Sequence, residues 1–164
     1  MKYFIISDTH LGHEAMVTLC GRKPDFSEKL LGQLQDVPLG SVFIHMGDIL
    51  IGNDAYWHDR IMERLQGARK WLVRGNHDRK SDSWYLDHGW DMVCEKLEIQ
   101  KHGWNIVFSH KPLEYELNVY TINIHGHLHN MEHRAKTGDG FLFSCEEWMR
   151  PVELQKFMEA KGII

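Results

Sequence analysis

The chain has 164 residues, a hydrophobic fraction of 43% and a charged fraction of 26%, which predict one ordinary globular domain over 1–164. Its net charge of -4 gives no support for a large basic surface, and although it leaves room for a small local patch we expect no stable nucleic-acid complex. No segment is apolar enough to span a membrane, and three scattered cysteines without a CxxC pair predict a reduced, cytoplasmic protein.

The first half of the chain alternates apolar segments with amphipathic ones. Strands are predicted at 2–7, 41–46 and 69–73. Helices are predicted at 27–37, which Pro38 ends, and at 55–66, which Asp54 could cap. Strands that are separated by helices indicate parallel βαβ units.

The second half is predicted to be rich in strands, at 92–100, 104–109, 120–124 and 140–145. The short segment 101–103 is typical of a hairpin connection. Pro151 suits the first turn of a helix over 151–160. We therefore expect an α/β protein in which two sheets pack face to face with helices outside.

Polar residues follow most of the predicted strands. In chain order they are Asp8, His10, Asp48, Asn76, His77, His110, His127 and His129. Because functional sites form outside the carboxyl ends of strands, these residues can converge. Imidazole, carboxylate and one amide oxygen suit Mn, Fe, Zn, Ni or Co better than calcium. Each residue alone has an ordinary explanation as a turn or strand-end residue, so the joint pattern carries the prediction.

These segments resemble the motif series of the calcineurin-like metallophosphoesterases, most closely the small prokaryotic and phage members. In order they are DTH (8–10), GD (47–48), GNHD (75–78), SH (109–110) and GHLH (126–129). The resemblance implies a four-layer α-β-β-α fold with two mixed sheets packed as a sandwich and flanked by helices. It also implies a dinuclear centre of two divalent metal ions, manganese before Fe, Zn, Ni or Co.

The resemblance also implies ligands for each metal. One metal would be held by Asp8, His10, Asp48 and His129. The other would be held by Asp48, Asn76, His110 and His127, so that Asp48 bridges the pair. Two such metals clamp the attacking and leaving oxygens of an in-line displacement at phosphorus, and they provide hydroxide near neutral pH.

His77 is not a ligand in this scheme, and with Asp48 it forms the predicted catalytic pair. The resemblance places His77 toward the substrate, where it would stabilise the phosphoryl oxygens or protonate the leaving alkoxide. Three positions after the bridging Asp, relatives carry an Asp that orients this histidine, or a Tyr ligand in the purple acid phosphatases. Here the residue is Ile51, which excludes the purple-acid branch. Asp54 and Asp78 remain alternatives as the orienting group.

Other polar residues are assigned with less support. His13, Arg74 and Lys111 are candidates for substrate binding, with solvated surface charge as the competing explanation. His125 precedes Gly126, and we expect it to be packed or to hold the loop by a hydrogen bond. The remaining histidines lack motif context and are predicted to be structural or exposed: His45, His58, His88, His102 and His133.

The predicted function is a dinuclear metal-dependent phosphodiesterase that acts on a phosphate ester, with nucleotide-like substrates among the candidates. The motifs occupy most of the chain and leave no room for a cap domain, and an open site favours diesters. A phosphomonoesterase or a nuclease of modest specificity is the nearest alternative. A non-catalytic metal-binding module is more distant, because all seven ligands and His77 are present. Substrate, native metal and oligomeric state stay open.

Overall fold

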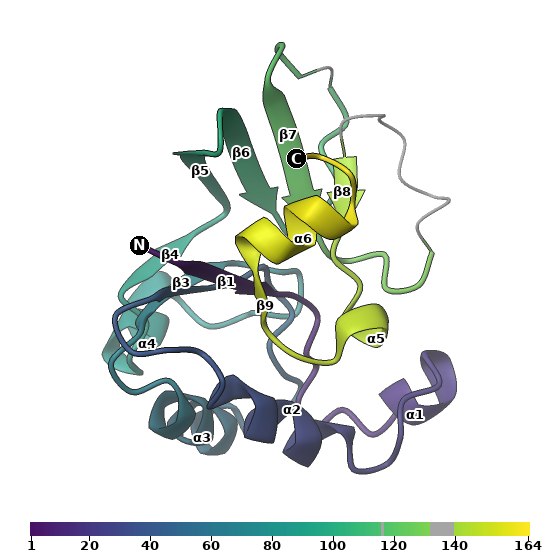
Figure 1. The fold of residues 1–164 in the computed structure, drawn as a ribbon. Coiled ribbons are helices and arrows are strands. Elements are labelled where there is room, and N and C mark those ends of the chain that lie inside the picture. The colour runs from purple at the N-terminus through teal and green to yellow at the C-terminus, as the bar shows by residue number, and fades with distance from the viewer. Residues whose placement is uncertain (116, 132–139) are drawn as a thin grey trace.

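The computed structural model describes residues 1–115, 117–131 and 140–164 and arranges them as two β-sheets with helices around them (Figure 1). The first sheet has the strand order β4-β3-β2-β1-β9. Four of its strands run parallel: β1 (Tyr3–Ile6), β2 (Val42–His45), β3 (Arg69–Val73) and β4 (Met92–Cys94). The short β9 (Val152–Glu153) pairs antiparallel with β1.

The second sheet has the order β5-β6-β7-β8. Strand β5 (Lys96–Lys101) is antiparallel to β6 (Trp104–Ser109), and the predicted hairpin connection joins them. Strands β6, β7 (Thr121–His125) and β8 (Gly140–Leu142) are parallel. Both sheets are therefore mixed. The predicted fold class, a sandwich of two mixed sheets flanked by helices, is confirmed.

The described residues also form six short helices: α1 (Met16–Leu19), α2 (Phe26–Leu34), α3 (Asp54–Arg64), α4 (Asp82–Asp87), α5 (Cys145–Trp148) and α6 (Leu154–Ala160). Helices α2 and α3 contact each other and lie together on one side of the first sheet (Figure 1). Within the described ranges, no helix has the length and apolar character needed to cross a membrane.

The core lies between the sheets and under the helices. Every residue of β2 is buried, which requires cover on both faces of the strand. Phe43 from the first sheet and Phe108 from the second are both fully buried in one continuous apolar cluster. Burial of this kind stabilises each large side chain by about 1.5–3 kcal/mol, so the core holds the strand ends in fixed positions.

The structure corrects two predicted elements. The segment 92–100 is not one strand, because Cys94 pairs with Val73 in the first sheet whereas Lys96 pairs with Ser109 in the second. The chain thus changes sheets at Glu95. The helix predicted to begin at Pro151 begins at Leu154, because residues 152–153 form β9 against β1.

Smaller differences concern the ends of elements. Asp54 is the first residue of α3, and Asn53 occupies the cap position with a left-handed backbone. The strand predicted over 140–145 ends at Leu142, and Cys145 already belongs to α5. Helices α1 and α4 were not predicted, since each is too short for a clear apolar period.

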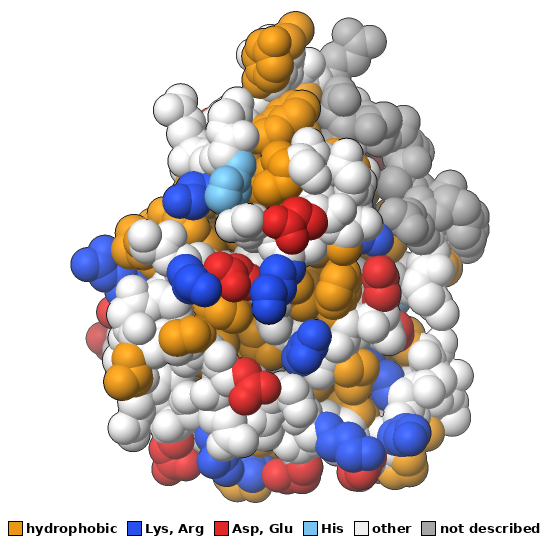
Figure 2. All heavy atoms as spheres, in the orientation of Figure 1, with side chains coloured by type: hydrophobic (Ala, Val, Ile, Leu, Met, Phe, Trp, Pro, Cys, Tyr) orange, Lys and Arg blue, Asp and Glu red, His pale blue; other side chains and the backbone are white. Residues whose placement is uncertain are grey.

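The outer surface mixes charges of both signs. Figure 2 shows Lys and Arg side chains interspersed with Asp and Glu over the face that is drawn. Opposite charges are paired at several points, for example Lys2 with Glu153 at 3.2 Å and Arg60 with Glu28 at 2.6 Å. The mixture agrees with the small net charge of -4.

Candidate metal centre

Backbone hydrogen bonds continue the ladder between β1 and β2 beyond the two strands. The N–H of Asp8 donates to the carbonyl of Gly47 at 2.9 Å, and that of His10 to the carbonyl of Asp48 at 3.0 Å. Five predicted ligands have a left-handed backbone: Asp8, His10, Asp48, His127 and His129. Such conformations cost roughly 1–3 kcal/mol each and persist where the surrounding bonds impose them. The loops therefore present these side chains in an enforced arrangement.

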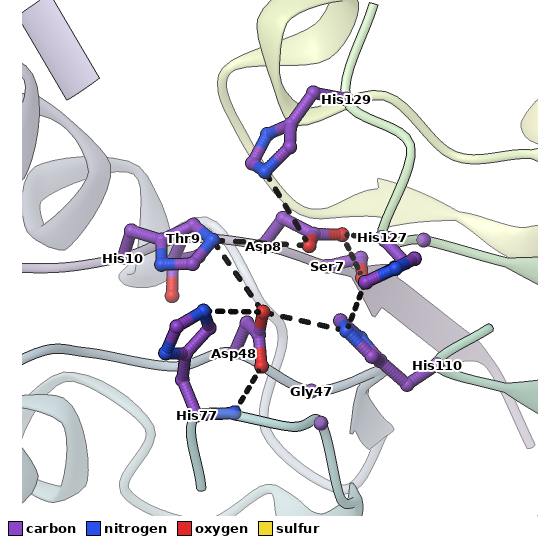
Figure 3. A network of polar contacts seen from close by, with 12 residues as sticks. Ser7, Asp8, Thr9, His10, Gly47, Asp48, His77, His110, His127 and His129 are labelled. Carbon is purple, nitrogen blue, oxygen red and sulfur yellow. Dashed lines mark hydrogen bonds and ion pairs between the residues drawn. The ribbon is translucent and has the colours of Figure 1, made fainter. Parts of the chain in front are cut away.

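The first cluster consists of Asp8, His10 and His129 (Figure 3). The Oδ2 of Asp8 accepts the Ser7 hydroxyl at 2.6 Å and the backbone N–H of His127 at 2.8 Å. Its Oδ1 lies 3.9 Å from Nε2 of His10 and 4.0 Å from Nε2 of His129. Among the described residues, this buried Oδ1 and both ring nitrogens of His10 have no hydrogen-bond partner. Unpaired buried polar atoms are rare, so their convergence indicates a place for a cation.

The second cluster is centred on Nε2 of His110. The Nδ1 of this ring lies 2.9 Å from the carbonyl oxygen of Met46, which can only accept, so Nδ1 carries the hydrogen. When this ring loses its second proton, as it must to bind a metal, Nε2 offers a lone pair. It faces Oδ1 of Asn76 at 3.1 Å, Nδ1 of His127 at 3.1 Å and Oδ2 of Asp48 at 3.3 Å. Such a set of converging lone pairs is stabilised by a positive charge among them.

Asp48 lies between the two clusters. Its Oδ2 is 3.6 Å from Nε2 of His10 and 3.3 Å from Nε2 of His110. Burial would raise its pKa, but the hydrogen bond and charge of His110 hold the pKa well below the usual range. Asp48 is therefore an anion, and it is placed as a bridging carboxylate would have to be.

The two clusters differ in how they respond to protons. Burial lowers the pKa of His10 to about 3, against the opposing effect of Asp48, so the ring is neutral with a lone pair available. Burial also disfavours charge on His110, but Asp48 and Asp8 outweigh it and raise the pKa of His110 to about 9. The position beside Asp48 thus favours a positive charge. The imidazole, carboxylate and amide donors of this centre fit two divalent metal ions.

We call the set Asp8, His10, Asp48 and His129 the first metal site, and the set Asp48, Asn76, His110 and His127 the second metal site. The structure brings both predicted sets together, while their role as ligands stays a prediction.

His77 lies at the edge of this centre. Its backbone N–H donates to Oδ1 of Asp48 at 2.8 Å, and its Nε2 is 3.9 Å from Oδ2 of the same carboxylate. The side chain is 37% exposed, so it can meet a substrate. Of the two proposed orienting groups, Asp78 accepts backbone N–H groups with both of its oxygens, and Asp54 pairs with Lys80 at 3.2 Å.

The predicted substrate-binding residues are placed differently from one another. The ring of His13 lies beside that of His10, with centroids 5.8 Å apart. Lys111 is exposed and lines a cavity of about 650 Å³ that also borders Asn76 and His110. Arg74 lines the same cavity, but its guanidinium already donates to Asp82 at 3.0 Å and to a backbone carbonyl at 2.9 Å. Lys111 is thus the freer cation of the two.

His125 is fully buried at the end of β7, and its Nδ1 lies 3.0 Å from the carbonyl oxygen of Gly126. This agrees with the packed position predicted for it. At Gly126 a Cβ would stand 1.9 Å from Oγ of Ser7 and 2.2 Å from Oδ2 of Asp8, so glycine lets the loop approach the first metal site. His133 lies outside the described residues.

Sequence reasoning gave no role at the centre to Arg22 and Glu146, and it predicted His45 only as structural or exposed. Arg22 and Glu146 form a buried ion pair at 2.6 Å, and Glu146 also lies 3.2 Å from Nδ1 of His129. Burial would raise the pKa of Glu146, but His129 and Arg22 lower it to about 2. His45 is buried behind the centre, 2.8 Å from the hydroxyl of Thr9. None of the three stands in a motif that would have identified it.

The sandwich of two mixed sheets, with His and Asp clusters at its strand ends, defines the class of protein. The chain belongs to the calcineurin-like phosphoesterase family, whose profile matches residues 1–160.

Comparison with individual proteins supports this assignment. A structure of a protein of unknown function from Aquifex aeolicus shares 26% identity and a TM-score of 0.76, with 99% of each chain covered. An uncharacterised protein of Methanocaldococcus jannaschii is 24% identical over 134 residues, which are 78% of this chain and 69% of that protein. A structure described as a novel archaeal phosphodiesterase has 17% identity and a TM-score of 0.53, covering 94% of this chain and 100% of the other, and shows the shared fold.

Proposed function

We propose that this protein is a two-metal phosphodiesterase. The observation that carries the proposal is the position of Asp48, whose Oδ2 faces His10 of the first metal site and His110 of the second at 3.6 and 3.3 Å. Two divalent cations held there, manganese being the first to test, would place positive charge at the phosphoryl oxygens and make a water molecule acidic enough to attack near neutral pH.

The protein's own groups complete the proposed chemistry. The hydrogen bond from the backbone N–H of His77 to Asp48 fixes the GNHD loop at this residue, and the partly exposed imidazole lies beside the cluster. From there it would donate a proton to the oxygen that leaves from phosphorus. An alkoxide is a poor leaving group, so such a proton contributes roughly 10²–10⁴-fold to the rate.

The cavity beside the second metal site supports a diester as the substrate. It has a volume of about 650 Å³ and is lined by Lys111, Pro112 and Leu113 as well as by Asn76 and His110. A second ester group, apolar or nucleotide-like, has room there. The ammonium of Lys111 would meet a phosphate oxygen of the same substrate. His13 would contact the substrate from the side of His10.

The proposal is tested by hydrolysis of bis-p-nitrophenyl phosphate and of p-nitrophenyl phosphate, each with added Mn²⁺ and with a chelator. We expect faster turnover of the diester, and loss of turnover with the chelator and in Asp48→Asn. Preference for the monoester would favour a phosphomonoesterase, and cleavage of oligonucleotides at comparable rates would favour a nuclease. Two bound metals without hydrolysis of any ester would favour a non-catalytic metal-binding module.

A further inference from the structure

A buried arginine ties together loops that carry the first metal site. The side chain of Arg22 is 1% exposed. Its Nη1 donates to the carbonyl of Thr9 at 2.7 Å, and its Nη2 to the carbonyl of Asp8 at 2.7 Å. Its Nε and Nη2 both donate to Oε1 of Glu146, at 2.9 and 2.6 Å. One guanidinium therefore fixes the loop after β1 and the start of α5 against each other.

Glu146 also contacts a predicted ligand of the first metal site. Its Oε1 lies 3.2 Å from Nδ1 of His129, and its Oε2 accepts the hydroxyl of Ser144 at 3.3 Å. A carboxylate that is ionised only accepts hydrogen bonds, so Nδ1 of His129 must carry the hydrogen. Nε2 of the neutral ring then has a free lone pair, and this is the nitrogen that lies 4.0 Å from Oδ1 of Asp8.

We propose that Arg22 and Glu146 act as a positioning pair for the first metal site, with Glu146 holding His129 in the tautomer that ligates through Nε2. The contacts of the pair reach Asp8, Thr9 and His129. In the second metal site, His110 is fixed instead by the carbonyl of Met46. The inference rests on the proposed two-metal function, and it adds that the two sites depend on different parts of the chain.

The same residues could instead form a third metal position. Ligand atoms of Cys20, His129 and Glu146 lie within 4.8 Å of one another, which could hold a soft cation. However, Oε1 of Glu146 already accepts two N–H groups of Arg22. The guanidinium neutralises the carboxylate and repels a metal at that point. The geometry thus favours a hydrogen-bonded positioning pair over a third metal position.

The test compares wild type, Glu146→Gln and Glu147→Gln. For each metal-free protein, Mn²⁺ binding is measured by calorimetry and by the metal content that remains after dialysis. Glu147 is the matched control, because it is the adjacent acid and its exposed carboxylate pairs with Lys161 at 3.1 Å, away from the predicted ligands. Loss of a group that orients a ligating histidine typically weakens metal binding 10–100-fold. In Glu146→Gln we expect Mn²⁺ affinity to fall by this factor at one of the two sites. In Glu147→Gln we expect wild-type affinity at both. Unchanged binding at both sites in Glu146→Gln would overturn the proposal.

A second measurement needs no variant of Glu146. Long-range ¹H–¹⁵N correlation spectra of the metal-free wild type, assigned with His129→Gln, report which nitrogen of His129 is protonated. At a pH at which the ring is neutral, a hydrogen on Nδ1 supports the proposal, and a hydrogen on Nε2 in place of Nδ1 overturns it even if Glu146→Gln fails to fold. A third metal equivalent, bound as zinc and lost in Cys20→Ser, would also overturn it.

These measurements stay separate from the test of the proposed function. Both report on metal binding and proton position, and neither requires turnover. A wild type that binds two Mn²⁺ but hydrolyses no ester would contradict the phosphodiesterase proposal, while the binding data would still decide the role of Glu146.

Discussion

The carboxylate of Asp78 accepts the backbone N–H of Asp48 at 2.8 Å, so the last residue of the GNHD segment holds the loop of the predicted bridging carboxylate. The same oxygen accepts the N–H of Gly75 at 2.8 Å, and the other oxygen accepts that of Ile49 at 3.0 Å. Asp78 is 5% exposed, so these bonds lie away from water. Its role is therefore structural support of the metal centre.

Replacing Asp78 by alanine would leave three backbone donors without their acceptor. At roughly 1–3 kcal/mol for each buried unpaired donor, we expect the free energy of unfolding to fall by at least about 3 kcal/mol. Urea denaturation measures the change. Asp36→Ala is the control, because Asp36 is exposed, and a change within about 0.5 kcal/mol is expected there. Equal stabilities of the two variants would contradict this role of Asp78.

His77→Ala tests the general-acid role through the leaving group. We expect the variant to keep two metals per chain, because His77 is not among the predicted ligands. Turnover of an alkyl phosphodiester should fall by roughly 10²–10⁴-fold, whereas a p-nitrophenyl ester, whose leaving group needs no proton, should lose much less. Steady-state kinetics with both substrates measure the difference. Losses of equal size on both esters would argue against a proton donor.

Two glycines form a matched pair for substitution by alanine. At Gly75 a Cβ would stand 2.2 Å from Oδ1 and 2.4 Å from the backbone N of Asp48, and backbone cannot move aside cheaply. We expect Gly75→Ala to lose about 1–3 kcal/mol of stability and to weaken Mn²⁺ binding. Gly32 lies in α2 with no atom within 4 Å of its Cβ position, so Gly32→Ala should gain about 1 kcal/mol. Thermal unfolding compares them, and a stabilised Gly75→Ala would refute the argument.

His45 predicts a dependence of stability on pH. The Thr9 hydroxyl donates to the carbonyl of Ile49 at 2.7 Å, so it accepts from Nε2 of His45 at 2.8 Å. Nδ1 of His45 in turn accepts the N–H of Gly47 at 3.1 Å, and protonation would break that bond. Burial lowers the pKa of His45 from 6.5 to about 3. Both loops of the centre thus depend on this ring being neutral.

The sign of the effect follows from proton uptake. Between pH 6.5 and about 3 the unfolded chain binds a proton at His45 that the folded protein does not bind. The free energy of unfolding therefore falls with decreasing pH, by up to about 1.4 kcal/mol per pH unit from this residue, and has no such contribution above pH 6.5. His45→Gln should show a shallower slope in urea denaturation at pH 4–6, whereas the exposed His102→Gln should match the wild type. Parallel slopes for all three proteins would rule out this account.

The local pattern of apolar and polar residues predicted those strands whose bounds depend on neighbouring residues in the chain. The strand at 69–73 is found with the same bounds, and the parallel pairing of the first three strands is confirmed. The division of 92–100 between two sheets was not predictable, because the side chains on both sides of Glu95 have strand character. Only pairing partners far away in sequence, Val73 and Ser109, distinguish β4 from β5.

The candidate site also has a part that was predicted from the sequence and a part that was not. The resemblance placed the predicted ligands in two groups, and the structure brings those groups together. Arg22 and Glu146 escaped notice because their contact joins positions 124 residues apart and follows no spacing rule. His45 was predicted to be structural or exposed, and its contacts were not predicted. Its contacts with Thr9 and Gly47 depend on how β1 and β2 align beyond their ends.

The pairing of β9 with β1 also has a consequence for synthesis on the ribosome. Ile5 pairs with Val152, so one edge of β1 stays without its partner until residues 152–153 have been made. An open strand edge readily pairs with other chains. Translation that stalls before residue 152 would therefore release nascent chains prone to aggregate, even though the loops that carry the predicted metal ligands are already complete.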